Sequence, residues 1–128
     1  MKYLFDTHVL LWLAEDRLRQ DSPVREIVES VSNDLFFSAA SIWEIAIKSS
    51  LGRDDFQVDA AAFRRELFDN GYQELPINGM HAFMVQGLPP FHKDPFDRLL
   101  IAQARVEGMT LVSADEQVIR YGGSLVVA

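Results

Sequence analysis

Tyr3–Leu13 reads YLFDTHVLLWL, and this stretch contains the pattern that decides the fold. Its first three residues predict a short buried strand, Asp6 follows the end of that strand, and the apolar residues from Val9 onward predict a buried helix. A similar pattern returns in TLVSAD at Thr110–Asp115, where an apolar run again leads to an acidic residue. A strand that leads into a helix is the repeating unit of an α/β sheet, so the sequence predicts that fold class.

The rest of the chain continues this alternation. Strands are predicted at Tyr3–Phe5, Leu35–Phe37, Tyr72–Ile77, Thr110–Ser113 and Leu125–Val127. Helices are predicted over Val9–Leu13, from Ser22-Pro23 to Val31, over Ala39–Leu51, from Asp59 to Asn70, between Asn78 and Gly87, from Asp94-Pro95 to near Gly108, and after Asp115. Proline in the third strand favours an edge position, because proline cannot donate a ladder hydrogen bond. Strands alternating with helices predict a parallel sheet with helices on both faces.

Composition fits one compact domain spanning residues 1–128. The chain is 48% hydrophobic and 24% charged, which allows a proper core and argues against disorder. It has no cysteine, which excludes disulfides and thiolate metal sites, and its three histidines have no zinc-like spacing. Any metal must therefore be bound mainly by oxygen. The N-terminus has neither a signal peptide pattern nor a membrane-spanning run, so we expect a cytoplasmic protein.

Acidic residues stand at four places that the predicted fold would bring together. Asp6 and Asp115 follow strand ends, Glu44 lies within a predicted helix, and Asp97 opens another. Ligands of open α/β sheets bind beyond the carboxyl ends of the strands, where the strand order reverses. A converged acidic cluster tolerates its own repulsion only around a hard divalent cation. The pattern indicates a metal-dependent nuclease.

Helix capping offers another interpretation of each acid. Asp6 and Asp115 have the position of N-cap residues, while Ser41 with Glu44 and Asp94 with Asp97 have capping-box spacing. Capping alone does not explain why acids fall both at the ends of two strands and at the starts of two helices. Their coincidence favours a site.

Net charge is the main argument against a nucleic acid partner. The chain carries 12 basic and 19 acidic side chains, a net charge of −7, whereas phosphate binding usually leaves a basic footprint. Bound cations would reverse the local sign if part of the acid excess lies in a metal site. Basic groups flank the acids at Lys48, Arg53, His92, Lys93, Arg98 and Arg105. Each of these is equally typical of a solvated helix face.

Four segments resemble those of PIN domains, and within that family the VapC-type toxins of bacterial toxin–antitoxin pairs. They are FDTHVLLWL (Phe5–Leu13), SAASIWEIAIK (Ser38–Lys48), HKDPFDRLLIAQA (His92–Ala104) and LVSAD (Leu111–Asp115). They occur in the family's order, cover nearly the whole chain, and the third is quite specific. The resemblance implies a five-stranded parallel sheet of order 3-2-1-4-5. It also implies an endoribonuclease that acts on RNA with Mg²⁺ or Mn²⁺, a cognate antitoxin and a homodimer.

The resemblance also gives the acids roles. Asp6 and Asp97 would be the principal metal ligands, Asp115 would hold a second metal or its waters, and Glu44 would bind metal or orient its water. Water activated by the metal would then hydrolyse the RNA phosphodiester, leaving a 5′-phosphate and a 3′-hydroxyl.

Several neighbours have subordinate expected roles. Ser113 would position Asp115 or a water, Asp94 would cap its helix, and Thr7 and His8 would line the site, His8 rather as a packing residue. Candidates for phosphate contact are Arg98, Lys93 and Lys48. For Arg98, an ion pair with an aspartate of its own helix is an equal alternative.

Other protein classes fit the residues less well. A receiver domain needs clustered acids after its first strand and a lysine after its fifth, and a haloacid-dehalogenase-type phosphatase needs a second aspartate where His8 stands. A PIN-like module that only binds a partner, and a nuclease that cuts DNA, remain alternatives. An apolar set could serve the core or a subunit interface, and the core is favoured in so short a chain; its members are Leu10, Trp12, Leu13, Val24, Ile27 and Val28.

Overall fold

The computed structural model describes residues 1–128, and it alternates strands with helices as the sequence predicts. The strands are β1 (Lys2–Phe5), β2 (Asp34–Ser38), β3 (Gln73–Leu75), β4 (Thr110–Ser113) and β5 (Leu125–Val127). The helices are α1 (Thr7–Ala14), α2 (Val24–Glu29), α3 (Ala39–Ser50), α4 (Ala60–Asp69), α5 (Gly79–Met84), α6 (Pro95–Glu107) and α7 (Glu116–Ile119), with a 3₁₀ turn η1 (Val85–Gly87) after α5.

The five strands form one sheet of order β3-β2-β1-β4-β5, and every neighbouring pair is parallel. This confirms the expected order. The order reverses between β1 and β4, where Phe5 pairs with Val112. Because these residues are level, the chain leaves both strands side by side. The N–H of Asp6 donates to the carbonyl of Val112 at 3.0 Å.

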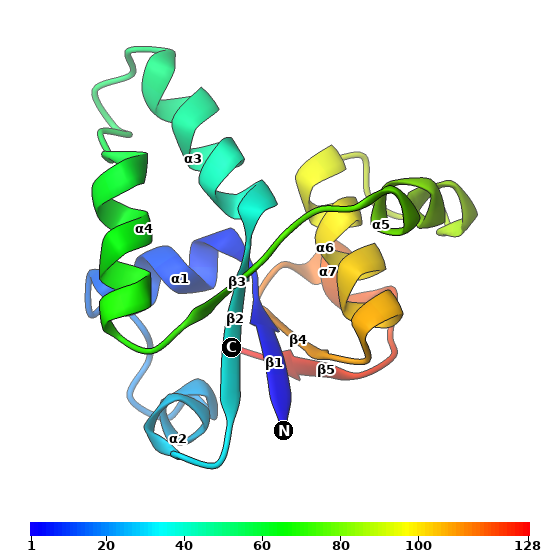
Figure 1. Cartoon of the computed structure of the whole chain (residues 1–128), viewed down its shortest axis with the longest axis horizontal. Helices are drawn as coiled ribbons and strands as arrows, with labels where there is room; N and C mark the ends of the chain where they lie inside the picture. Colours follow the sequence, from blue (N-terminus) through cyan, green and yellow to red (C-terminus); the bar gives the residue numbers. More distant parts are fainter.

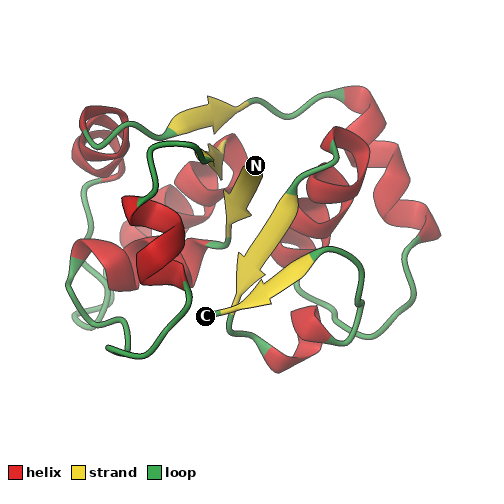
Figure 2. Ribbon diagram, turned by 90° about the horizontal axis from the view of Figure 1, so that it is seen from below, coloured by secondary structure: helices red, strands yellow, loops and turns green.

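Helices cover both faces of the sheet, as Figure 2 shows from below. Strand residues alternate between two cores: Tyr3 and Phe5 belong to the core that includes residues of α1, α3 and α4, and Leu4 to the core that includes residues of α6 and α7. Sheets buried on both faces have apolar residues at successive positions, which explains the short continuous apolar runs in the sequence. In Figure 1, α3 and α4 lie to one side of the upper half, with α5 and α6 opposite.

Local signals set most element ends. Asp94 accepts the N–H groups of Phe96 and Asp97 and so caps α6, with Pro95 in its first turn. Gly108 ends α6 in the left-handed conformation, with φ of 67°. The third strand is shorter than predicted and ends before Pro76, at the sheet edge where proline is tolerated.

The apolar set that could have been an interface belongs to the core. Leu10 and Val24 are fully buried, and Trp12, Leu13, Ile27 and Val28 pack against the same cluster. The helix of Ser22-Pro23 starts at Val24, whose N–H is accepted by the Ser22 hydroxyl at 3.3 Å. None of the helices has the length and apolar character that crossing a membrane requires.

Candidate metal centre

Asp6 is buried at the end of β1 and divides its two oxygens between two tasks. Oδ1 accepts the N–H of Val9 and caps α1, while Oδ2 accepts the hydroxyl of Ser113 at 2.5 Å. Burial raises the pKa of Asp6 above its ordinary value, although the bonds from Ser113 and Val9 oppose the rise. Capping and site formation are therefore compatible in one carboxylate.

Asp115 repeats this arrangement after β4. Its Oδ1 accepts the N–H groups of Gln117 and Val118 and caps α7. The backbone N–H of Asp115 donates to the Ser113 hydroxyl at 3.1 Å, so Ser113 links the acid after β1 to the acid after β4. Ser113 was expected to position Asp115 or a water. Its hydroxyl contacts the backbone N–H of Asp115 and, in addition, the carboxylate of Asp6.

Asp97 lies in the first turn of α6, facing the other acids. Its pKa is raised to about 6, first because the side chain is buried and next because Asp94, Asp6 and Glu44 are negatively charged, while the bond from His92 opposes the rise. Asp97 is therefore close enough to both Asp6 and Glu44 to be repelled by their charges. The capping interpretation does not account for this carboxylate, since it bonds His92 and not the start of its own helix.

Glu44 is buried in α3 and only half satisfied. Its Oε2 accepts the ammonium of Lys48, one turn later, at 2.7 Å. Its Oε1 is the one buried side-chain oxygen or nitrogen of the chain without a hydrogen-bond partner. Ser38 caps α3 and Ser41 lies inside it, so the capping-box interpretation of Ser41 with Glu44 is wrong. An unpaired buried carboxylate oxygen is costly unless a cation meets it.

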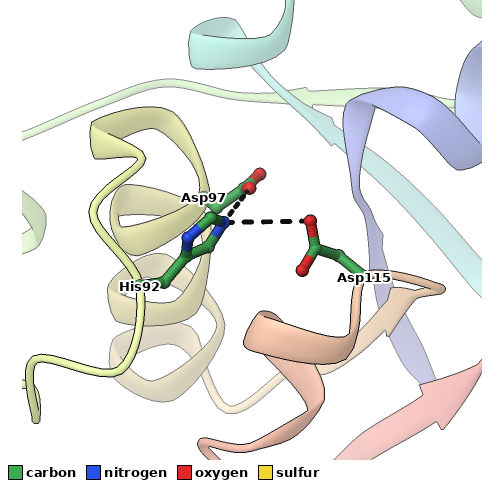
Figure 3. Close-up of side chains that lie close together, drawn as sticks. All are labelled: His92, Asp97 and Asp115. Atoms are coloured by element: carbon green, nitrogen blue, oxygen red, sulfur yellow. Dashed lines mark hydrogen bonds and ion pairs between the residues drawn. The ribbon is translucent and has the colours of Figure 1, made fainter.

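His92 joins the acids from the loop before α6, as Figure 3 shows. Its Nε2 lies 2.8 Å from Oδ2 of Asp97 and 3.8 Å from Oδ2 of Asp115. One atom from each of the three side chains falls within 4.8 Å of the others. In the sequence His92 is one of the basic groups that flank the acids, and the signal for a role in the centre is its position two residues before Asp94, which caps the helix that carries Asp97.

The centre thus has two parts that meet at Asp97. The inner part consists of Asp6, Glu44 and Ser113, all buried, and the outer part consists of His92, Asp97 and Asp115, all partly exposed. The donor set is rich in carboxylate oxygen and includes an orphaned buried one, which fits a hard divalent cation such as Mg²⁺ or Mn²⁺. Without a cation, burial first and then the negative charges of Asp94, Asp6 and Glu44 raise the pKa of Asp97.

The remaining predicted residues lie around this centre with different roles. Thr7 is buried and donates to the Ser41 hydroxyl at 2.8 Å, which ties α1 to α3. His8 is exposed on α1 beside Trp12; it opposes the rise that burial causes in the pKa of Asp6, but its side chain does not belong to the group formed by His92, Asp97 and Asp115. Lys93 is exposed, and Lys48 pairs with Glu44.

Arg98 has a role that differs from both predicted alternatives. Its guanidinium donates to the carbonyls of Val85, Leu88, Pro89 and His92 and to the hydroxyl of Tyr121. These acceptors occupy both terminal nitrogens, so Arg98 fixes the loop before α6 and forms neither a free phosphate contact nor an ion pair. The prediction of phosphate contact by Arg98 is therefore corrected.

Comparison with known families identifies the fold. The PIN domain family model matches residues 3–124, so the chain belongs to the PIN domain family. A comparison with curated proteins gives no significant match.

Several solved structures with similar folds are toxin–antitoxin complexes. A chain of VapBC2 from Rickettsia felis, bound to a DNA fragment from the promoter, has a TM-score of 0.69 at 16% identity, with 100% of this chain and 98% of that chain covered. VapBC-1 from nontypeable Haemophilus influenzae has a TM-score of 0.63 at 17% identity, covering 94% and 92%. A toxin–antitoxin complex from Klebsiella pneumoniae has a TM-score of 0.65 at 16% identity, covering 98% and 96%. These similarities extend over the whole fold.

Proposed function

We propose that this chain is a metal-dependent endoribonuclease and the toxin of a toxin–antitoxin pair. One observation carries the catalytic part of the proposal: carboxylates from four separate elements converge at the point where the strand order reverses, and one of their buried oxygens has no partner. A module that only binds a partner gains nothing from an unpaired buried charge. Membership of the PIN domain family supports the same conclusion.

The protein side chains divide the work of the reaction. Asp6, Asp97 and Glu44 would hold Mg²⁺ or Mn²⁺, and Asp115 would hold a second ion or its waters. A bound ion of this kind lowers the pKa of water and neutralises charge on a phosphodiester during in-line displacement. Ser113 keeps Asp6 in place through a bond of 2.5 Å, and the capping bonds of Asp6 and Asp115 fix both carboxylates relative to the sheet.

Two lysines are the proposed phosphate contacts. Lys93 is exposed one residue after His92, and the ammonium of Lys48 lies 2.7 Å from Glu44 at the edge of the acids. Both would attract an RNA backbone to a chain whose net charge of −7 otherwise repels it. A cation at Glu44 would compete for the carboxylate and leave Lys48 available for phosphate.

Partners are proposed from the structural neighbours and from the surface. The neighbours from Rickettsia felis, Haemophilus influenzae and Klebsiella pneumoniae are toxin–antitoxin complexes, so we expect a cognate antitoxin in the cytoplasm. A homodimer is supported by large apolar side chains exposed on α3, at its C-cap and on α5, namely Trp43, Ile47, Leu51, Met80, Phe83 and Met84. Exposed apolar side chains in such number are typical of protein–protein interfaces.

Solution mass tests the homodimer. A stable dimer buries roughly 800 Å² on each partner. Light scattering should give twice the 14.5 kDa mass of the chain for the wild type and the monomer mass for Phe83→Glu. Val31→Glu is the matched control, because Val31 is fully exposed away from α3 and α5, and it should stay dimeric. A monomeric wild type would contradict this part of the proposal.

Cleavage of a total cellular RNA pool tests the proposed reaction. A pool is preferable because a ribonuclease with a narrow target can ignore a single oligonucleotide. Purified protein with Mn²⁺ or Mg²⁺ should give discrete fragments, which should be absent with chelator and with Asp97→Asn. Cleavage that survives in chelator, or equal activity of Asp97→Asn, would contradict the proposal.

A parallel reaction on single-stranded and duplex DNA separates the alternatives. Metal-dependent cleavage of DNA but not RNA would replace the ribonuclease with a deoxyribonuclease. Normal folding without any cleavage, together with no Mn²⁺ binding, would favour a module that only binds a partner.

A further inference from the structure

His92 is held in place by contacts that have no need of the acids. Its backbone N–H donates to the hydroxyl of Tyr121 at 3.0 Å, and its carbonyl accepts from Arg98. Arg98 also donates to the same Tyr121 hydroxyl at 3.0 Å. Phe91, the preceding residue, packs edge-on against the Tyr121 ring with centroids 5.2 Å apart. The loop therefore presents the imidazole in one position, from outside the acid cluster.

The imidazole points between two carboxylates that come from different elements. Asp97 belongs to α6 and Asp115 caps α7, and Nε2 of His92 faces an oxygen of each, at 2.8 and 3.8 Å. Ligand atoms that surround one ion at about 2.1 Å lie roughly 3.0–4.2 Å from one another. The separations of 2.8 and 3.8 Å lie just below and within this range, so small shifts of the side chains would bring all three ligand atoms around one ion.

A simple ion pair explains less of this geometry. An ion pair with Asp97 requires only one carboxylate, and solvent could satisfy Asp97 without a histidine whose loop is fixed. The fixed loop, the second carboxylate and the buried orphan oxygen of Glu44 on the other side of Asp97 together describe a place for cations. Oxygen ligands suit Mg²⁺, whereas imidazole nitrogen favours transition metals.

We propose that His92, Asp97 and Asp115 form a mixed nitrogen and oxygen position that binds a transition-metal dication such as Mn²⁺ or Co²⁺ in preference to Mg²⁺. His92 is a direct ligand at this position, and Asp97 is shared with the inner part of the centre. The inference rests on the proposed function, since it assigns a ligand within the same metal site. It makes the activity of this chain depend on the supply of transition metal.

Pulsed electron paramagnetic resonance of bound Mn²⁺ tests the ligand directly, because a coordinated imidazole nitrogen couples to the electron spin. The chain has only three histidines, and His81 is fully buried against Glu107, so the signal can be assigned. We expect nitrogen coupling in the wild type, its loss in His92→Gln and its retention in the matched control His8→Gln. The glutamine amide can still bond Asp97, so a merely positioning role of His92 would leave Mn²⁺ affinity unchanged.

Titration calorimetry supplies the affinities. His92→Gln should lower the affinity for Co²⁺ at least about tenfold and change the affinity for Mg²⁺ much less. Bound Mn²⁺ without nitrogen coupling in the wild type would overturn the inference and leave the nuclease proposal intact. A wild type that binds no Mn²⁺, or binds it as well as Asp97→Asn does, would overturn both.

Discussion

The inner and outer parts of the metal centre meet different electrostatic demands. In the inner part, Asp6 and Glu44 are each only 2% exposed, and Glu44 keeps an oxygen without a partner. In the outer part, the side chains of His92 and Asp115 are 18% and 36% exposed, and a histidine lies between the two acids. The inner part is buried and keeps one carboxylate oxygen without a partner, while the outer part is accessible and its acids lie beside a histidine. A cation should therefore stabilise the inner part more, and the outer part should decide which cation enters.

Asp6→Asn should have the largest effect, since it removes charge from the inner part. Asparagine caps helices as well as aspartate does, so the fold should survive. We expect RNA cleavage to fall at least about 100-fold, equivalent to about 2.7 kcal/mol of transition-state stabilisation. Single-turnover cleavage measures this. Asp59→Asn, the equivalent change at the N-cap of α4, is the control and should leave cleavage unchanged.

Arg98→Lys should weaken the support of the outer part. The compact ammonium of lysine cannot replace the fork that reaches four carbonyls and Tyr121, so several partly buried acceptors lose their donors. We expect a loss of about 2 kcal/mol in the free energy of unfolding, measured with urea. Arg17→Lys, at an exposed ion pair, should cost nothing measurable. Equal stability of Arg98→Lys and the wild type would contradict the claim that Arg98 fixes the loop before α6.

The buried acids of the centre should make the stability of the metal-free protein depend on pH. The pKa of Asp97 is about 6 in the folded protein, against about 3.9 in an unfolded chain. Between these values the folded state binds more protons, so metal-free stability contributed by Asp97 falls as the pH rises from about 4 to 6. The raised pKa of Asp6 acts in the same direction.

Asp97→Asn should remove this contribution. In chelator at pH 7.5 we expect its Tm to exceed that of the wild type by about 3–6 °C, equivalent to roughly 1 kcal/mol. Added Mn²⁺ should raise the Tm of the wild type and leave that of Asp97→Asn nearly constant. Calorimetric scans across pH measure both effects, and a lower Tm for Asp97→Asn in chelator would contradict the repulsion.

Lys48→Gln should have the smallest effect. Lys48 and Glu44 are one helical turn apart, and their ion pair is partly exposed. Such pairs contribute about 0.5 kcal/mol to the free energy of unfolding. Removing the ammonium frees Glu44, so Mn²⁺ should bind roughly twofold tighter, about 0.4 kcal/mol. Affinity for RNA, measured with Asp97→Asn as the background, should fall. Weaker Mn²⁺ binding would mean that Lys48 supports the site and does not compete with it.

The sequence indicated the acids that follow strands better than the side chains that loops position, and the reason is physical. Asp6 and Asp115 follow strands, and parallel strands that are level deliver their following residues to one edge, so the pattern alone indicated that these acids lie close together. The order of the sheet came from the family resemblance. Strand ends were predicted within about two residues, and Thr110–Ser113 and Leu125–Val127 agree with the structure.

Loop side chains escaped prediction because distant residues orient them. The backbone N–H of His92 donates to the hydroxyl of Tyr121, a residue far along the chain, and no local sequence pattern predicts this bond. Arg98 was expected at phosphate because its charge was read without its neighbours; the carbonyls of residues 85–92 surround it only after folding. The capping-box alternative for Ser41 with Glu44 fails because α3 begins five residues before Glu44, with Ser38 as its N-cap.

Manganese binding and RNA cleavage, measured on the same sample across one Mn²⁺ titration, test most directly the claim that the converged carboxylates form a catalytic cation site. We predict that cleavage rises in proportion to Mn²⁺ occupancy in the wild type, and that Asp97→Asn loses both together. Full cleavage before Mn²⁺ binds, or saturated binding with no cleavage of any RNA in the pool, would contradict that claim.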